Sequence, residues 1–324
     1  MTTEIQHRFV ETNGIRMHIA EAGEGPLVVL CHGFPESWYS WRHQIRALAE
    51  AGYHVVAPDQ RGYGQTDAPE DAASYTQLHL VGDIVGLLDA LGEETAVVAG
   101  HDWGAPVAWN AALMRPDRFP AVIALSVPYT PRGAIKPTDA MKAMAGDNFF
   151  YILYFQEPGK AEAELEADVR RTLRMFNYSA SGDPELGTYF RRMPKDRTFL
   201  EWCGDPGEDW HTWLAPEELD FYVGEFERAG FRGGLNWYRN VDRTWELMAA
   251  FDGAKVRVPA LFIAGDRDGV VAANPQAVTN LATHVPDLRE TVMLPGCGHW
   301  TQQERPQEVT GAMLRFLESV SGAR

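Results

Sequence analysis

The sequence predicts an α/β fold, in which a mostly parallel sheet is flanked by helices and interrupted by an inserted helical cap. Short runs of apolar, β-branched residues alternate with helix-spaced apolar residues in the first part of the chain, and the alternation returns near its end. The expected strands are almost continuously apolar, which is typical of a parallel sheet covered on both faces. With 324 residues, 45% of them hydrophobic, the chain is long enough for this core and an insertion.

Residues 1–130 are expected to form the first part of the core. Apolar, β-branched runs predict strands at 16–20, 27–31, 54–57, 96–99 and 121–127. Helix-spaced apolar residues predict helices at 41–51, 76–91 and 104–114. Each predicted helix lies between two strands, as a connection between parallel strands requires.

The cap is predicted over residues 131–246. This stretch is helical in character, is broken by Pro and Gly, and is rich in Phe, Tyr and Trp. The α/β pattern then returns in residues 247–324, which are expected to complete the core. Strands are predicted there at 260–264 and 290–294, and a closing amphipathic helix at 306–320.

Charge and composition exclude several classes of partner. The 29 Lys and Arg residues against 45 Asp and Glu residues give a formal net charge of −16, which argues against nucleic acid or an anionic membrane surface. The N-terminus lacks the apolar run of a signal peptide, and no stretch approaches the roughly 18 consecutive apolar residues of a membrane span, so we expect a soluble, cytoplasmic protein. The spacing of Cys31, Cys203 and Cys297 matches no zinc site, so we expect buried free thiols and no metal.

The pentapeptide Gly100-His101-Asp102-Trp103-Gly104 is the most informative motif. It follows a predicted strand and opens a predicted helix, so Asp102 stands where a hydrolase elbow of pattern Gly-x-Ser-x-Gly carries serine. An aspartate has an ordinary pKa of about 3.9 and is ionised at neutral pH, so it can attack without a base. Because it brings its own carboxyl group to the ester, it must be alkylated by an electrophilic saturated carbon. A base is needed afterwards to hydrolyse that ester.

Two further loops carry candidates for that base and its partner. Gly265-Asp266-Arg267-Asp268 and Gly296-Cys297-Gly298-His299 both follow predicted strands, and the carboxyl ends of parallel strands meet at one edge of a sheet. The order nucleophile, acid, histidine is that of α/β-hydrolases. We expect His299 to activate water and Asp268 to orient it, although spacing alone scarcely separates Asp268 from Asp266.

The loop His32-Gly33-Phe34-Pro35 is expected to help form an oxyanion hole. In this layout the donors are the backbone N–H groups of Phe34 and of Trp103, the residue after the nucleophile. We expect a cis Phe34–Pro35 bond, since cis peptides are largely confined to X–Pro. His32 is interpreted as structural, and Trp103 as a residue that also lines the pocket.

Five segments together resemble soluble epoxide hydrolases of the α/β-hydrolase fold. They are residues 32–41, 100–104, 153–159, 235–240 and 296–302, in that order along nearly the whole chain. The resemblance is to single-domain bacterial members and to the C-terminal hydrolase half of the mammalian enzymes. It implies a central sheet of about eight strands and hydrolysis of an epoxide to a vicinal diol without a cofactor.

The resemblance also implies roles for individual residues. Asp102 would be the nucleophile, Asp268 would orient His299, and the cap tyrosines Tyr154 and Tyr238 would bind and activate the epoxide oxygen. Tyr154 is preferred over Tyr151, one turn earlier. The substrate pocket would be lined by Phe34, Pro35, Trp103 and Trp300.

Three alternatives stay open at this point. Haloalkane dehalogenases share the elbow aspartate and the following tryptophan, but they typically carry Asn at the position of Phe34 and lack paired cap tyrosines. Fluoroacetate dehalogenases place arginine after the nucleophile, where this chain has Trp103. A non-catalytic binder of small apolar molecules is disfavoured by the intact set of reactive residues. The natural epoxide, its regio- and enantioselectivity, a detoxifying or metabolic role, and the oligomeric state, with a homodimer as one option, are not determined by the sequence.

Overall fold

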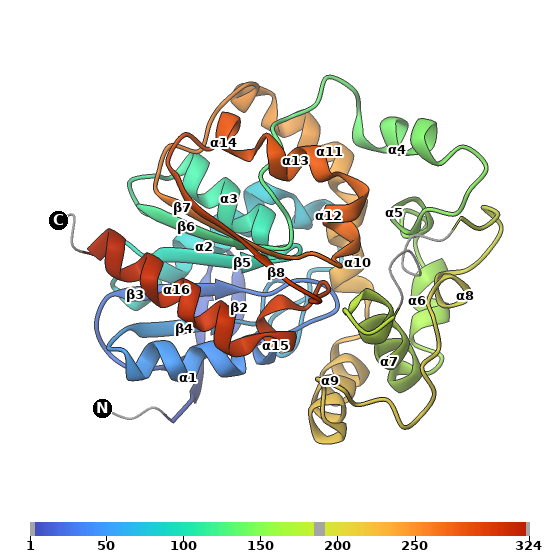
Figure 1. Cartoon of the computed structure of the whole chain (residues 1–324), viewed down its shortest axis with the longest axis horizontal. Helices are drawn as coiled ribbons and strands as arrows, with labels where there is room; N and C mark the ends of the chain where they lie inside the picture. The colour runs from blue at the N-terminus through green and yellow to red at the C-terminus, as the bar shows by residue number, and fades with distance from the viewer. Residues whose placement is uncertain (1–3, 185–191, 322–324) are drawn as a thin grey trace.

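The computed structural model describes residues 4–184 and 192–321. Its core is one eight-stranded sheet of order β1-β2-β4-β3-β5-β6-β7-β8 (Figure 1). Strands β3 to β8 are parallel to one another. Strand β2 is antiparallel to both of its neighbours, β1 and β4. The expected α/β fold with a mostly parallel sheet is therefore confirmed. The strands are β1 (Gln6–Thr12), β2 (Ile15–Ala22), β3 (Leu27–Cys31), β4 (His54–Pro58), β5 (Val97–His101), β6 (Ala121–Leu125), β7 (Ala260–Gly265) and β8 (Leu288–Leu294).

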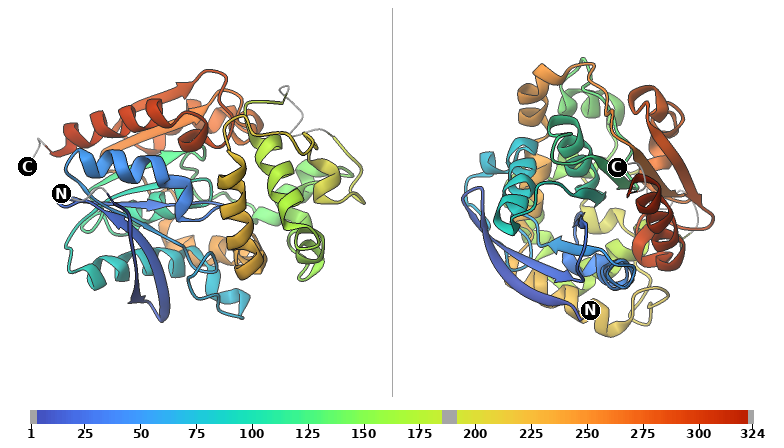
Figure 2. Two further views of the ribbon diagram at one scale, coloured as in Figure 1. Left: turned by 90° about the horizontal axis from the view of Figure 1, so that it is seen from below. Right: turned by 90° about the vertical axis from the view of Figure 1, so that its left-hand side faces the viewer.

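Helices cover both faces of this sheet. Neighbouring residues of β3 point to opposite faces, so Val28 packs in the cluster that includes α1 and α16, while Val29 packs in the cluster that includes α2 and α3. This two-sided burial explains why the strand is apolar throughout. Figure 2 shows α1 beside α16. The core helices are α1 (Arg42–Glu50), α2 (Gln77–Leu91), α3 (Gly104–Met114), α12 (Gly269–Ala273), α13 (Pro275–Thr279), α14 (Leu281–His284), α15 (Thr301–Glu304) and α16 (Pro306–Ser321).

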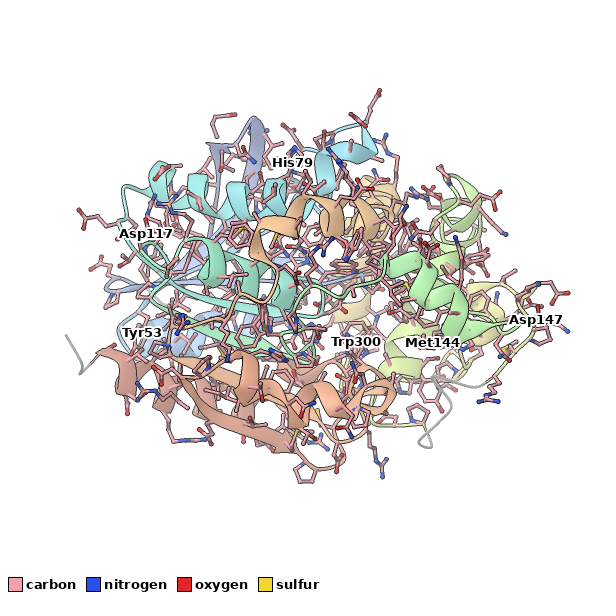
Figure 3. The ribbon with its side chains drawn as sticks, turned by 90° about the horizontal axis from the view of Figure 1, so that it is seen from above. Tyr53, His79, Asp117, Met144, Asp147 and Trp300 are labelled. Carbon is pink, nitrogen blue, oxygen red and sulfur yellow. The ribbon has the colours of Figure 1, made fainter. Side chains whose placement is uncertain are left out.

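The insertion between β6 and β7 is helical. Its helices gather mainly at one end of the sheet in Figures 1 and 2. Figure 3 places Trp300 where core and cap meet, and Asp147 at the outer end of the cap. The helices are α4 (Pro137–Ala145), α5 (Tyr151–Tyr154), α6 (Lys160–Leu165), α7 (Val169–Ala180), α8 (Phe199–Trp202), α9 (Pro216–Ala229), α10 (Arg232–Arg239) and α11 (Val241–Leu247). Short 3-10 helices lie at Trp38–Trp41, Ala72–Tyr75 and Met248–Phe251.

Two compositional expectations can be compared with the structure. Cys31 and Cys297 are buried free thiols, as expected, and Cys203 is also buried. Across residues 4–184 and 192–321, no helix is long and apolar enough to cross a bilayer.

Candidate active site

The site is built around a strained turn at Asp102. This residue follows β5, precedes α3 and has φ of 50°, in the left-handed region that non-glycine residues rarely adopt. The flanking glycines make the turn sterically feasible. A Cβ added to Gly100 would overlap the Gly104 carbonyl oxygen, and one added to Gly104 would overlap the Cys31 carbonyl oxygen. The Gly-x-Asp-x-Gly pattern is therefore a packing requirement of the elbow.

The two oxygens of the Asp102 carboxylate have different partners. Oδ1 accepts a hydrogen bond of 2.8 Å from the Phe34 backbone N–H. Oδ2 lies 3.2 Å from Nε2 of His299. The Phe34–Pro35 bond is cis, as predicted. One oxygen is thus held at a backbone donor while the other faces the candidate base.

Asp268 is the acid that contacts His299. Both of its carboxylate oxygens lie 3.1 Å from Nδ1 of His299, and Oδ1 also accepts the Val270 N–H at 2.8 Å. Asp268 is fully buried, whereas Asp266 is exposed and accepts the Gly296 N–H at 2.7 Å. The structure therefore separates the two aspartates that spacing could not, because only one side chain turns inward.

The electrostatics of the site follow from these contacts. Burial alone would raise the pKa of Asp102, but His299, the neighbouring His101 and the Phe34 N–H together lower it below its ordinary value. Burial alone would lower the pKa of His299, but the carboxylates of Asp268 and Asp102 outweigh it and raise that pKa well above its ordinary value. The imidazole of His299 thus lies between the carboxyl groups of Asp102 and Asp268, which favour its protonated form.

Tyr238 of α10 lies among aromatic rings that border the nucleophile. It is 3% exposed, and its ring centroid lies 4.9 Å from that of Trp103 and 5.4 Å from that of Phe34, both in edge-on geometry. Tyr238 is thus brought to the residues directly beside Asp102, as the resemblance implied.

The structure does not bring Tyr154 to the nucleophile. Its hydroxyl donates to Glu164 at 2.8 Å, and Lys160 Nζ lies 5.0 Å from its ring centroid. Burial raises its pKa, and the further increases come from cap carboxylates, first Glu164 and then Glu157. Tyr154 therefore faces a polar part of the cap, away from the site.

Tyr151, and not the preferred Tyr154, faces the site. Its ring centroid lies 5.9 Å from that of Tyr238, and its ring stacks on Trp202 at 5.7 Å. Burial raises the pKa of its phenol, and the charges of Asp102 and Asp268 raise it further. Tyr151 and Tyr238 are thus neighbouring phenols, and Tyr151 lies close enough to Asp102 and Asp268 to feel their charge.

Comparison with known proteins identifies the family. A family model described as alpha/beta hydrolase fold matches residues 26–176. Epoxide hydrolase A of Mycobacterium tuberculosis is 50% identical over 313 residues, which cover 96% of each chain. The solved Epoxide Hydrolase A from Mycobacterium thermoresistibile is 51% identical with a TM-score of 0.92, covering 97% of this chain and 98% of that one. An epoxide hydrolase from an endophytic Streptomyces is 46% identical with a TM-score of 0.95, covering 98% and 96%. This chain belongs to the epoxide hydrolase family.

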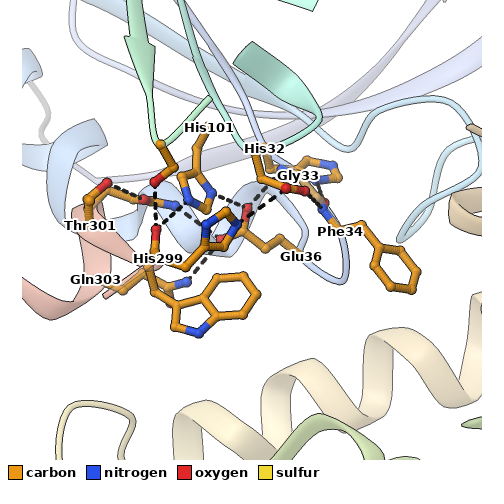
Figure 4. A network of polar contacts seen from close by, with 12 residues as sticks. His32, Gly33, Phe34, Glu36, His101, His299, Thr301 and Gln303 are labelled. Atoms are coloured by element: carbon orange, nitrogen blue, oxygen red, sulfur yellow. Dashed lines mark hydrogen bonds and ion pairs between the residues drawn. The ribbon is translucent and has the colours of Figure 1, made fainter. Parts of the chain in front are cut away.

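In this member of the epoxide hydrolase family, a buried carboxylate lies behind the catalytic loops. Glu36 is 2% exposed and lies between the Phe34 loop and the segment that carries His299 (Figure 4). It accepts hydrogen bonds from the Gly33 N–H at 2.8 Å and from the side-chain amides of Gln302 at 3.0 Å and Gln303 at 3.1 Å. These three donors fix the position of the Glu36 carboxyl group.

His101, the residue before the nucleophile, connects Glu36 to the base. Its Nδ1 lies 2.8 Å from Glu36 Oε2, and its Nε2 lies 2.8 Å from the carbonyl oxygen of His299. Through these two contacts the ring joins the Glu36 carboxyl group to the backbone of His299. The sequence analysis missed this pair, although a charged residue and a histidine inside otherwise apolar motifs were the available signal.

The remaining predicted residues surround the triad. Trp300 is fully buried, donates from its indole N–H to the Asn177 carbonyl at 2.8 Å, and places its ring edge-on to His299 with centroids 5.0 Å apart. Pro35 is buried beside Phe34. His32 has a structural role, as expected, because its Nε2 accepts the Gln60 N–H at 3.0 Å. Within the described residues, no group of three or more His, Cys, Asp or Glu side chains could hold a metal ion.

Proposed function

We propose that this chain hydrolyses epoxides to vicinal diols through an alkyl ester on Asp102, with Tyr151 and Tyr238 as the acids. One observation carries the proposal. An ionised carboxylate at a nucleophile elbow, backed by a histidine and a buried aspartate, is faced by a pair of tyrosines. Tyr151 replaces Tyr154 in this role, because Tyr154 is bonded to Glu164.

In the first step, Oδ2 of Asp102 attacks a ring carbon and the carbon–oxygen bond of the epoxide breaks. The negative charge then develops on an oxygen that stays attached to the carbon skeleton and must be protonated. Tyr151 keeps its proton at neutral pH because its pKa is raised by burial and by the nearby aspartates. It can therefore donate, with Tyr238 as the second hydrogen-bond donor to the same oxygen.

In the second step, the ester is hydrolysed. Esterification removes the negative charge of Asp102, one of the two groups that raise the pKa of His299, so that pKa falls. The proton that His299 then releases replaces the one that Tyr151 donated, and the neutral imidazole becomes a base. His299 takes a proton from water, and the water oxygen attacks the ester carbonyl carbon. The charge that develops on Oδ1 is stabilised by the Phe34 N–H, already 2.8 Å away, and by the Trp103 N–H at the start of α3. As the tetrahedral intermediate collapses, the bond between the carbonyl carbon and the former Oδ2 breaks, and His299 returns its proton to that oxygen, so the diol leaves. The water oxygen stays in the carboxyl group of Asp102, whose proton passes to His299.

The aromatic surroundings favour a lipophilic epoxide. Besides Tyr238, the ring of Phe34 packs edge-on or tilted against Phe155, Phe176 and Phe231. We propose Phe34, Pro35, Trp103 and Trp300 as the part of the core that borders the bound substrate. A haloalkane dehalogenase would use the same nucleophile, but the paired phenols supply protons that a departing halide does not need.

The intact mass of a His299→Gln variant after exposure to styrene oxide tests the reaction type. Without the base, the ester should accumulate, and the protein should gain the mass of the whole epoxide at Asp102. An Asp102→Ala variant is the matched control and should gain nothing. No adduct with the epoxide, together with a haloalkane adding only its alkyl group, would indicate dehalogenation instead.

A cytoplasmic location and a homodimer stay predictions. Cell fractionation tests the first. Size-exclusion chromatography with light scattering tests the second, since a homodimer would have twice the 36.2 kDa mass of the chain.

A further inference from the structure

The helix that carries Tyr151 is too short to fix its own position. Helix α5 has four residues, Tyr151–Tyr154, and no side chain caps its N-terminus. A single helical turn is unstable in isolation, because fixing the backbone of its residues costs more free energy than its few hydrogen bonds contribute. The direction of Tyr151 must therefore be set by the groups that hold α5 from outside.

Gln156 links α5 to the helix that carries the other phenol. Its Nε2 donates to the Ile152 carbonyl at 2.9 Å and to the Tyr238 carbonyl at 2.9 Å. These use both N–H groups of the amide. Each acceptor lies in the last turn of its helix, where carbonyl groups lack the usual partner four residues later in the helix. One amide thus joins the residue after Tyr151 to the backbone of Tyr238 itself.

Arg239 makes a second link between the same elements. Its Nε donates to the Phe155 carbonyl at 3.1 Å, just after α5. Its Nη1 and Nη2 pair with the two oxygens of Glu162 at 2.7 and 2.9 Å, in a bidentate geometry that resists rotation. The chain that leaves α5 is therefore held to the end of α10 on both sides.

Helix α10 is in turn fixed to the core. A Cβ added to Gly233 would overlap the Gly62 carbonyl oxygen, and one added to Gly234 would lie 2.7 Å from a ring carbon of Phe34. The Trp237 indole N–H donates to the Arg61 carbonyl at 3.1 Å. The backbone of α10 thus rests directly on core loops, including the loop that binds the nucleophile.

We propose that Gln156 is a positioning residue for ring opening: it transfers the fixed position of α10 to α5 and so holds Tyr151 beside Tyr238 over Asp102. The proposal rests on the proposed function. Gln156 contacts neither His299 nor the Phe34 loop through any hydrogen bond of the described structure. Its loss should therefore slow formation of the ester and leave hydrolysis of the ester unchanged.

The test is single-turnover kinetics with styrene oxide, in which ester formation and ester hydrolysis are measured as separate rates. Gln156→Met keeps the length of the side chain and removes both donors. We expect ester formation to slow by about tenfold or more, since small misplacements of catalytic groups cost this much. Ester hydrolysis should stay within about twofold. Asn148→Ala is the matched control, because this cap amide donates to the local Ala145 carbonyl at 2.9 Å and to no other group of the described residues. Both its rates should match wild type.

Combination with Tyr151→Phe distinguishes positioning from general support of the fold. If Gln156 acts through Tyr151, the double variant should be little slower than Tyr151→Phe alone. Multiplicative losses, equal slowing of both steps, or no slowing would overturn the proposal. Gln156→Glu, of the same length, serves if the Met variant does not fold. Failure of the wild-type protein to form any ester would instead refute the proposed function.

Discussion

Replacing Tyr151 by Phe removes one of the two phenols that we propose as donors to the epoxide oxygen. The side chain keeps its shape, so its packing on Trp202 and against Tyr238, at 5.7 and 5.9 Å, should persist. What is lost is one hydrogen bond to an oxygen that becomes charged in the transition state. Such bonds contribute about 1.5–3 kcal/mol. Ester formation should therefore slow by about 10- to 150-fold, at 1.36 kcal/mol for each factor of ten.

Tyr154→Phe is the matched control, three residues away on the same helix. It removes the hydroxyl that donates to Glu164, whose carboxylate still accepts the backbone N–H groups of Phe199 and Leu200. The variant should lose about 0.5–1.5 kcal/mol of stability. Its rate of ester formation should equal that of wild type.

The assay is rapid mixing of excess enzyme with styrene oxide, with acid quench and intact-mass measurement of the ester at each time. Urea denaturation of the same samples gives the free energy of unfolding. The reasoning is refuted if Tyr154→Phe slows ester formation and Tyr151→Phe does not, because the distinction between the two rests only on where the structure places their hydroxyls.

Three further predictions concern the glycine contact, the acid and the base. Gly233→Ala should destabilise the protein by about 1–3 kcal/mol, because the new methyl group has no space against the core backbone. Gly224→Ala, in an open position within α9, should instead stabilise the protein by about 0.5–1 kcal/mol. A urea denaturation in which Gly233→Ala has the higher free energy of unfolding of the two variants would contradict this prediction. Asp268→Asn should slow ester hydrolysis by about 10²–10⁴-fold, while Asp266→Asn leaves it near wild type in single-turnover assays. The rate of ester hydrolysis should rise with pH as His299 loses its proton. The midpoint of this rise should lie below the pKa that NMR gives for His299 in the free enzyme. A midpoint at or above that pKa would exclude the proposed loss of charge on alkylation.

The core half of the site could be predicted because its residues follow strands. Asp102 and Phe34 follow the apolar, buried strands β5 and β3, and His299 follows the mostly exposed strand β8. Parallel strands bring their carboxyl ends together. No tertiary contact had to be known in advance. Asp266 and Asp268 are the limit of this reasoning, since both follow β7 and only the direction of the side chains separates them.

The cap half could not be predicted in the same way. Tyr151 and Tyr154 share a helix of one turn, and both are aromatic residues with aromatic neighbours, so no periodicity distinguishes them. The direction of each depends on contacts with Gln156 and Arg239, which are distant from the core in the sequence. The sequence also does not predict the first strand, β1, because most of its residues are exposed and its apolar residues do not form a continuous run.

The groups that we propose for the two chemical steps lie in separate stretches of the chain. The carboxylate, the base and the backbone donor all belong to the core, whereas both phenols lie on α5 and α10 of the insertion. Substitutions within this one contiguous segment can therefore change which epoxide the protein accepts. The residues that hydrolyse the ester lie outside the segment and would be unchanged. In chimeras that exchange this segment, with Gly62 kept as its contact in the core, the choice of epoxide should change. The rate of ester hydrolysis should stay the same, because the core supplies the groups for that step.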